Sequence, residues 1–383
     1  MRCSLDVGVF GNKRLRRAAV SVFTAPALIG ALLTLTAPAW VSPAQAASAS
    51  DVPAASAPAA SSPAAGTGVA GAATQPIASH ADANAWLARI DRAARQETYE
   101  GTFIYQRGGS FQSSKIIHYL DHGNELERVE GLDGRPTRTL RKNDDVYTFV
   151  PDRKLVIVDR RSNKYTFPAL LASGPGQLLD VYDVRPVGDD RVAGFDSQVI
   201  ELVPKDAYRF AFRLWFDKKT GLLLRAQTLD DKNQVLEQIA FSQLTFNVPY
   251  DHRTVGNGIR DTSGWNVVHP PIDTVDMAAE GWQVPPVVAG FHAIRELRRP
   301  MAAREQGAPP VQVDQAVYSD GLSAVSVFVE PVGKSDRKEG IASSGATHIL
   351  VRKSGDFWVT VVGEVPQPTL EQFATSIAFK PAK

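Results

Sequence analysis

Few residues of this chain stand at the spacings that catalysis or metal binding requires. His118 and His122 lie four residues apart, a spacing that would suit two metal ligands on one face of a helix. The pattern around them predicts a strand and its turn, where these positions are well separated along the chain. We therefore expect solvated polar residues there. The pairs Asp144–Asp145 and Asp189–Asp190 are typical of turns and do not indicate an acid–base pair.

The sequence contains none of the common catalytic motifs. It has no G-x-S-x-G, no H-E-x-x-H, no G-x-G-x-x-G after a strand and no P-loop. The glycine-rich stretch 173–176 lacks the lysine and the buried strand of a phosphate loop. The one cysteine, Cys3, lies in a segment that we expect to be removed, so the mature chain has no thiol chemistry. We predict a protein that is not an enzyme and uses no metal or cofactor.

Two sets of basic residues could bind an anion. Alternate residues on adjacent strands share a face, so such sets could hold lipid phosphates or an acidic peptide. A solvated face balanced by nearby acids explains the same pattern. The candidates are Arg135, Arg138, Arg141, Arg160 and Arg161 in the first set and Arg295, Arg298 and Arg299 in the second.

An aromatic surface is the second candidate site. Within residues 208–216 large apolar side chains alternate with others, so they fall on one face of a strand. This surface is either ordinary core beneath an amphipathic helix or a cavity for acyl chains, since a half-open sheet lined with aromatic rings buries apolar ligands well. The candidates for a lipid cavity are Phe103, Tyr105, Phe210, Phe212, Phe216 and Phe241.

Three sequential strands over residues 208–246 must position this surface. Turns are predicted at 217–221, with Gly221 in the left-handed conformation, and at 230–233. In the third strand the apolar phase slips between Phe241 and Leu244, which indicates a β-bulge.

An amphipathic helix precedes these strands and is the natural cover for a sheet. Trp86, Leu87, Ile90 and Ala94 recur at helical spacing, with Asp82 as the expected N-cap. From residue 99 onward short period-two stretches alternate with turn residues, which is typical of an antiparallel barrel or a strongly curved sheet.

The N-terminal segment has the pattern of an export signal. Basic residues at 13–17 precede an apolar run at 27–35, and small residues end at Ala46, where we expect cleavage. Without residues 1–46, which carry five basic residues and one acidic residue, the net charge is slightly negative. Charge therefore gives no argument for nucleic acid or for anionic membranes.

The rest of the chain divides into four parts. Residues 47–79, rich in Ala, Pro and Ser, are expected to be a disordered leader. Residues 80–250 form the large domain, and 251–280 connect it to a small α+β domain at 281–383. In the small domain we predict a closing helix at 367–377, capped by Thr369. Its predicted strands are 311–318, 324–329, 347–351 and 358–362.

The stretch RLWFDKKTGLLLRAQTLD at 213–230 resembles the MucB/RseB family of periplasmic regulators of the sigma-E factor. SDGLSAVSVFVEP at 319–331 and VVGEVP at 361–366 resemble the second domain of that family. The resemblance covers nearly all of the chain past residue 79. It implies an α+β fold of two domains: a large unclosed antiparallel β-barrel similar to the lipoprotein carriers of the LolA type, with covering helices, and a smaller domain with an antiparallel sheet.

The resemblance also implies a function. Such a protein would negatively regulate the sigma-E envelope stress response in the periplasm. It would bind the periplasmic part of a membrane-spanning anti-sigma factor of the RseA/MucA type and shield it from a site-one protease. Lipid, lipopolysaccharide in particular, would release it.

Other functions stay open. A periplasmic lipid or lipoprotein carrier is the alternative, although a simple carrier does not require the second domain. An envelope hydrolase is disfavoured, because no nucleophile and base can be paired by motif. A homodimer is compatible with an open sheet that has exposed edges.

Overall fold

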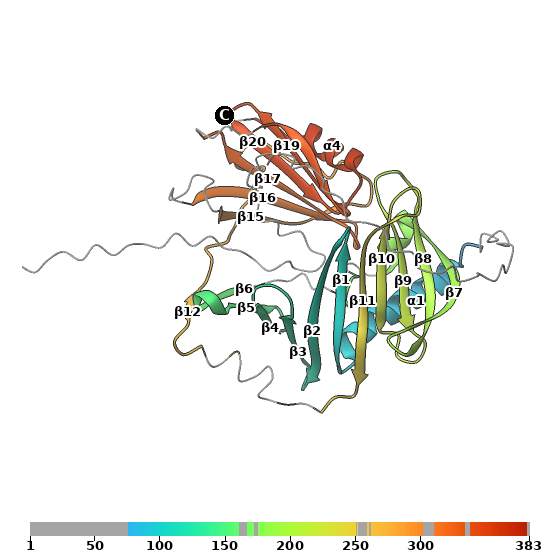
Figure 1. Ribbon diagram of the computed structural model, residues 1–383. Helices are drawn as coiled ribbons and strands as arrows, with labels where there is room; N and C mark the ends of the chain where they lie inside the picture. Colours follow the sequence, from blue (N-terminus) through green and yellow to red (C-terminus); the bar gives the residue numbers. More distant parts are fainter. Residues whose placement is uncertain are drawn as a thin grey trace, which may run out of the picture.

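The computed structural model describes residues 76–160, 167–171, 175–249, 251, 259, 262–301, 310–333 and 338–380 (Figure 1). The expected signal peptide, nearly all of the leader, and Arg161 lie outside the described residues. No helix in the described part of the chain is long and apolar enough to cross a membrane.

The large domain is one curved sheet that does not close. Its strand order is β12-β6-β5-β4-β3-β2-β1-β11-β10-β9-β8-β7, and every pairing is antiparallel except that of β12 with β6. The predicted curved antiparallel sheet is thus confirmed. The strands are β1 (Tyr99–Arg107), β2 (Ser110–Asp121), β3 (Asn124–Gly131), β4 (Arg138–Lys142), β5 (Asp145–Val150), β6 (Leu155–Arg160), β7 (Tyr182–Val192), β8 (Phe195–Pro204), β9 (Ala211–Asp217), β10 (Leu223–Leu229), β11 (Val235–Phe246) and β12 (Asn266–Val268).

Helix α1 (His80–Gln96) packs on the concave side of this sheet, next to the short helix α2 (Pro175–Val181). Its buried stripe joins the strands in one apolar core. The predicted N-cap, Asp82, is wrong by three residues: Ser79 caps the helix, and its Oγ accepts from the backbone N–H of Asp82. The Asp82 carboxylate in turn accepts from the Ser79 hydroxyl, so both residues serve the first turn.

The bulge and the tight turn form where the local sequence predicted them. Thr102 pairs with Gln243 and Phe103 with Phe241, so Ser242 is the extra residue of the predicted bulge in β11. Gly221 has a φ of +90° as expected, and it also packs closely against the side chain of Arg89. The prediction for Asp189–Asp190 is wrong, because both lie on β7 and the turn comes later, at Ala193 and Gly194.

The small domain is a seven-stranded antiparallel sheet in the order β13-β15-β16-β17-β20-β19-β18. Helix α4 (Gln367–Ser376) packs on β17, β19 and β20. The four predicted strands are confirmed as β16, β17, β19 and β20. The strands are β13 (Asp273–Thr274), β15 (His292–Met301), β16 (Val311–Ser319), β17 (Ala324–Pro331), β18 (Gly340–Ser344), β19 (Thr347–Ser354) and β20 (Phe357–Gly363), with β14 (Trp282–Gln283) and β21 (Ala378–Phe379) forming a separate pair.

Three details of the small domain differ from expectation. Thr369 lies inside the first turn of α4 and is not its cap; its hydroxyl donates to the backbone carbonyl of Tyr208 in the large domain, at 2.7 Å. The basic residues at 295–299 lie on a strand, β15, that the sequence did not indicate. The segment 251–280, which was predicted only as a connection, contributes strand β12 to the large sheet and strand β13 to the small one.

Candidate functional site

The six aromatic residues predicted to line a cavity are all buried, but they do not form one surface. Phe103 and Phe241 cluster with Phe167, with ring centroids 5.0 to 6.2 Å apart. Tyr105, Phe212 and Phe216 belong to the same large-domain core. Phe210 is the exception, because its ring stacks on His348 of the small domain, with centroids 6.0 Å apart.

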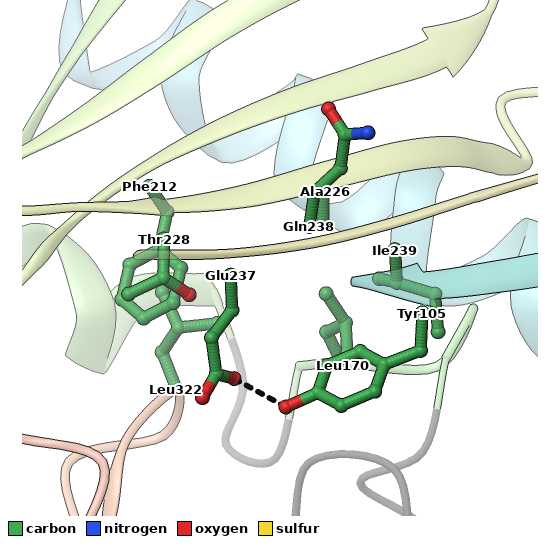
Figure 2. Close-up of a pocket in the computed structure, with 9 residues that line it drawn as sticks. All are labelled: Tyr105, Leu170, Phe212, Ala226, Thr228, Glu237, Gln238, Ile239 and Leu322. Carbon is green, nitrogen blue, oxygen red and sulfur yellow. Dashed lines mark hydrogen bonds between the residues drawn. The ribbon is translucent and has the colours of Figure 1, made fainter. Parts of the chain in front are cut away.

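A small cavity lies at the meeting point of the two domains (Figure 2). Its volume is about 10 Å³, room for roughly one water molecule. Leu322, in the turn between β16 and β17 of the small domain, joins the large-domain core and forms part of the cavity wall. An acyl chain would therefore need Leu322 or the neighbouring segment 167–171 to move. The lining is Tyr105, Leu170, Phe212, Ala226, Thr228, Glu237, Gln238, Ile239 and Leu322.

Glu237 lines the cavity and also takes part in a second contact between the domains. Its buried carboxylate accepts from the Tyr105 hydroxyl at 2.7 Å and from the backbone N–H of Ala346 at 3.0 Å. The Arg107 guanidinium lies 3.6 Å away. Gly345, with a φ of +58°, sits so close to Glu237 and Arg107 that a Cβ there would collide with both side chains. The tip of the β18–β19 hairpin is thus seated on the large domain.

This contact contains a second carboxyl group. Burial of the Glu364 carboxyl, and secondarily the charge of nearby Glu237, raise the pKa of Glu364 to about 8 from its ordinary value of 4.5, and Arg107 opposes the rise. Burial is also the main reason that the pKa of the Tyr105 hydroxyl is raised. At neutral pH the Glu364 carboxyl is therefore largely protonated, which lets two acidic side chains meet at the contact.

A buried ion pair forms a further contact between the domains. Arg209 donates from Nε to Asp320 at 2.8 Å, and both side chains are fully excluded from solvent. The same guanidinium also bonds to Asp206 and to the backbone carbonyl of Ala289, and it lies 5.1 Å from the ring centroid of Phe291.

Asp320 also shapes the turn that carries Leu322. Its second oxygen accepts from the backbone N–H groups of Leu322, at 3.0 Å, and Ser323, at 2.7 Å. Burial raises the pKa of the Asp320 carboxyl, although these amides and Arg209 act in the opposite direction. Leu322, Asp320 and Arg209 thus act together at one contact.

The first basic set is not gathered into one patch. Arg138 and Arg141 are three residues apart on β4 and so point to opposite faces. Arg138 lies over the ring of Phe149, at 4.5 Å from its centroid. Arg135 lies exposed in the turn before β4, and Arg160 ends β6 with an exposed side chain.

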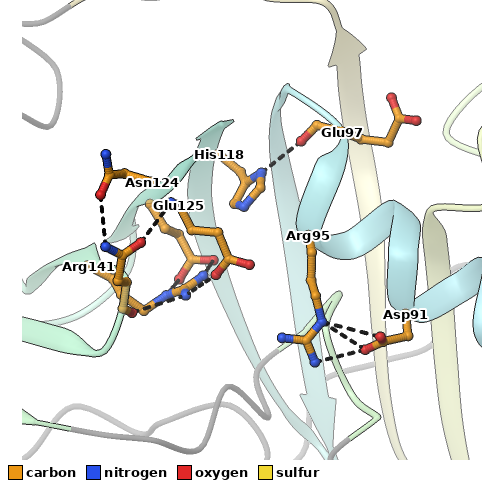
Figure 3. A network of polar contacts seen from close by, with 9 residues as sticks. Asp91, Arg95, Glu97, His118, Asn124, Glu125 and Arg141 are labelled. Atoms are coloured by element: carbon orange, nitrogen blue, oxygen red, sulfur yellow. Dashed lines mark hydrogen bonds and ion pairs between the residues drawn. The ribbon is translucent and has the colours of Figure 1, made fainter. Parts of the chain in front are cut away.

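Arg141 belongs instead to a buried polar network (Figure 3). Its guanidinium pairs with Glu125 at 2.7 Å and Glu127 at 3.1 Å. Beside it, His118 donates from Nδ1 to the backbone carbonyl of Glu97 at the end of α1, and its ring stacks on Tyr99. Burial, the largest influence, lowers the pKa of the His118 imidazole. The bond to Glu97 makes His118 a residue that joins α1 to the sheet, whereas Arg141 joins β4 to β3 within the sheet. The prediction of a solvated side chain is therefore wrong for His118, which is buried.

No metal site links the histidines in the described part of the chain. No group of three or more potential ligands was found there. His122 is exposed in a turn, where its Nδ1 contacts Asp121 at 2.6 Å.

In the second basic set, Arg298 pairs with Asp314 at 2.7 Å and with Glu280 at 3.5 Å. Arg295 and Arg299 lie on the same strand and alternate with Arg298 between its faces.

Sequence reasoning missed the residues that join the domains. Glu237 and Arg209 fall on strands or connections that were assigned only apolar roles, and Asp320 was assigned only to a turn. The one available signal was the charge of Arg209 and Glu237 within largely apolar stretches.

Comparisons with known proteins agree over both domains. The MucB/RseB N-terminal domain matches residues 82–259, and the MucB/RseB C-terminal domain matches residues 276–378. The chain is 31% identical over 308 residues to the sigma factor AlgU regulatory protein MucB of Pseudomonas aeruginosa, covering 79% of this chain and 92% of that protein. It is 25% identical over 305 residues to the sigma-E factor regulatory protein RseB of Escherichia coli K12, with coverages of 79% and 92%. A crystal structure of MucB in complex with MucA(peri) is similar to it at 31% identity and a TM-score of 0.60, covering 79% of this chain and all of that one.

Proposed function

Because the chain belongs to the MucB/RseB family, we propose that it is a periplasmic regulator that binds the periplasmic part of a membrane-spanning anti-sigma factor. The observation that supports this most is that both family domains match, in order, a chain similar to MucB, whose complex with MucA(peri) has been solved. The export pattern of residues 1–46 supports the periplasmic location.

The regulation we propose is protection from proteolysis. Bound to the anti-sigma factor, the protein shields it from a site-one protease and so restrains the sigma-E response. The test mixes the mature chain, from Ala47, with the immobilised periplasmic segment of its host's anti-sigma factor. We expect retention on the segment and slower cleavage of the segment by the protease. If the chain is not retained, the proposal is refuted.

We further propose that lipid, lipopolysaccharide in particular, releases the partner. The support is the largely apolar cavity that Leu322 helps to line. A hydrocarbon chain that enters there by displacing Leu322 would also disturb the contact between the domains. Lipopolysaccharide added to the complex should therefore elute the protein. Leu322→Ala enlarges the cavity, so we expect this variant to respond at a lower lipid concentration.

A lipid or lipoprotein carrier is the second candidate, supported by the unclosed sheet of the large domain and the aromatic-rich core on it. It predicts tight lipid uptake by a chain that does not bind the anti-sigma segment. Binding of the segment that lipid leaves unchanged would instead refute the release proposal and keep the regulator.

A further inference from the structure

The open edges of the two large sheets differ in how they are protected. Natural sheets avoid unwanted pairing through short edge strands, prolines, bulges and charges. In the described part of the chain, the edge strands β12 and β13 have three and two residues. The edge strand β7 carries Pro186, a register shift between Pro186 and Gly188, and the acidic pair Asp189–Asp190.

Strand β18 has none of these protections. It contains five residues, Gly340–Ser344, all of them exposed, without a proline or a charge. Its pairing with β19 is regular along its whole length, and β19 is its one partner strand among the described residues. Within the described residues, the backbone N–H and C=O groups on its other side therefore have no strand to pair with, and such a row is a template for an added strand.

Contacts at both ends hold this strand in place. Before it, the Glu339 carboxylate accepts from the backbone N–H of Lys353 at 2.6 Å and so continues the ladder beyond Gly340. After it, the hairpin turn at Gly345 and Ala346 is seated on Glu237 of the large domain. A template fixed at both ends loses little further conformational freedom when a partner pairs with it.

Ile341 favours an apolar residue at the facing position of any strand that is added to this edge. It pairs directly with Leu350, so the two side chains share a face. Leu350 is buried in the core beneath α4, whereas Ile341 is 42% exposed. An added strand with an apolar residue opposite Ile341 would cover it and extend this core by one strand.

We propose that the open edge of β18 binds an extended segment of the anti-sigma factor as an added β-strand, with an apolar residue beside Ile341. This inference rests on the proposed function and assigns it a docking surface. Only an extended peptide can satisfy a row of backbone donors and acceptors; an acyl chain would leave them buried and unpaired.

A second copy of the chain fits this edge less well. Two five-residue edges would bury far less than the roughly 1,200 Å² that stable interfaces need. A flexible partner segment can continue over neighbouring surface as it orders.

The first test is hydrogen exchange of backbone amides in the mature chain, with and without the periplasmic segment of the anti-sigma factor. We expect exchange at residues 340–344 to slow by about tenfold or more in the complex, as amides do when they enter a ladder. The amides along the β7 edge should exchange at their original rate. A complex that forms while exchange at 340–344 is unchanged would overturn the edge proposal and leave the proposed function standing.

A pair of variants tests the same edge by affinity. Ile341→Lys places a charge where the added strand would pack, and we expect it to weaken binding of the segment by about tenfold. Ile104→Lys is the matched control: Ile104 is also an exposed isoleucine, at 37%, but its strand β1 is paired on both sides at this residue, with Ala240 and with Ser113. Equal affinity of both variants would overturn the edge proposal.

Two further outcomes separate the remaining possibilities. A wild-type chain that does not bind the segment at all would refute the proposed function together with the partner assigned to this edge. Exchange at 340–344 that slows with increasing concentration of the chain alone would identify a second copy as the occupant and overturn the assignment.

Discussion

The buried ion pair between Arg209 and Asp320 should hold the two domains together, and Arg209→Met tests it. The change keeps an apolar side chain against Phe291 but leaves the Asp320 carboxylate buried with only backbone amides as partners. Breaking one side of a buried pair costs about 3–5 kcal/mol. Because the pair spans the domains, this loss should fall on their docking.

Asp320→Asn should cost less than Arg209→Met. The asparagine keeps an oxygen for the two backbone amides, and Arg209 keeps Asp206 and the carbonyl of Ala289. The double variant should cost less than the sum of the two single variants, because each single change leaves a buried group without its partner.

The assay is urea unfolding, combined with limited proteolysis of the chain between the domains. We expect Arg209→Met to separate unfolding into two transitions and to speed cleavage between the domains. Arg298→Met is the matched control, because its pair with Asp314 lies within one domain and is one-third exposed at the arginine; it should cost at most about 1 kcal/mol. If Arg209→Met costs no more than this control, the ion pair does not hold the domains.

Two more predictions concern charge. The raised pKa of Glu364 means that protonation favours the docked domains, so docking should be strongest at low pH and weaken as the pH rises from about 4.5 through about 8. Glu364→Gln should flatten this dependence in urea titrations at several pH values, and a wild-type profile without this slope would contradict it. Arg141→Met leaves Glu125 and Glu127 partly buried side by side, so it should lower the free energy of unfolding by about 3–5 kcal/mol. A loss below about 1 kcal/mol, measured by the same titration, would show that water screens both carboxylates.

The sequence predicted those features that depend on neighbours along the chain. The phase slip after Phe241 indicated the bulge, because alternation of side chains is local. Strand β15 was missed because Arg298, Arg299 and Pro300 interrupt the apolar alternation; the strand forms because β13 and β16 pair with it on either side.

The contacts between the domains could not be predicted in this way. Arg209 and Asp320 are 111 residues apart, and no local pattern relates them. The aromatic set was predicted as buried or cavity-lining from alternation alone, but alternation ends where a strand ends. Phe210 precedes the first residue of β9 and therefore meets His348 of the other domain.

Two of the contacts between the domains connect the two proposals about binding. Leu322 lies in one hairpin turn of the small domain, and Gly345 and Ala346 lie in another turn that directly continues strand β18. Both turns belong to one seven-stranded sheet, which moves as a unit more easily than it deforms. A ligand that displaces Leu322 would therefore also shift the turn seated on Glu237, and with it the fixed end of the β18 edge. Binding of lipid and binding of the partner then both depend on how the two domains are docked. Thermodynamic linkage requires each ligand to lower the affinity for the other by the same factor.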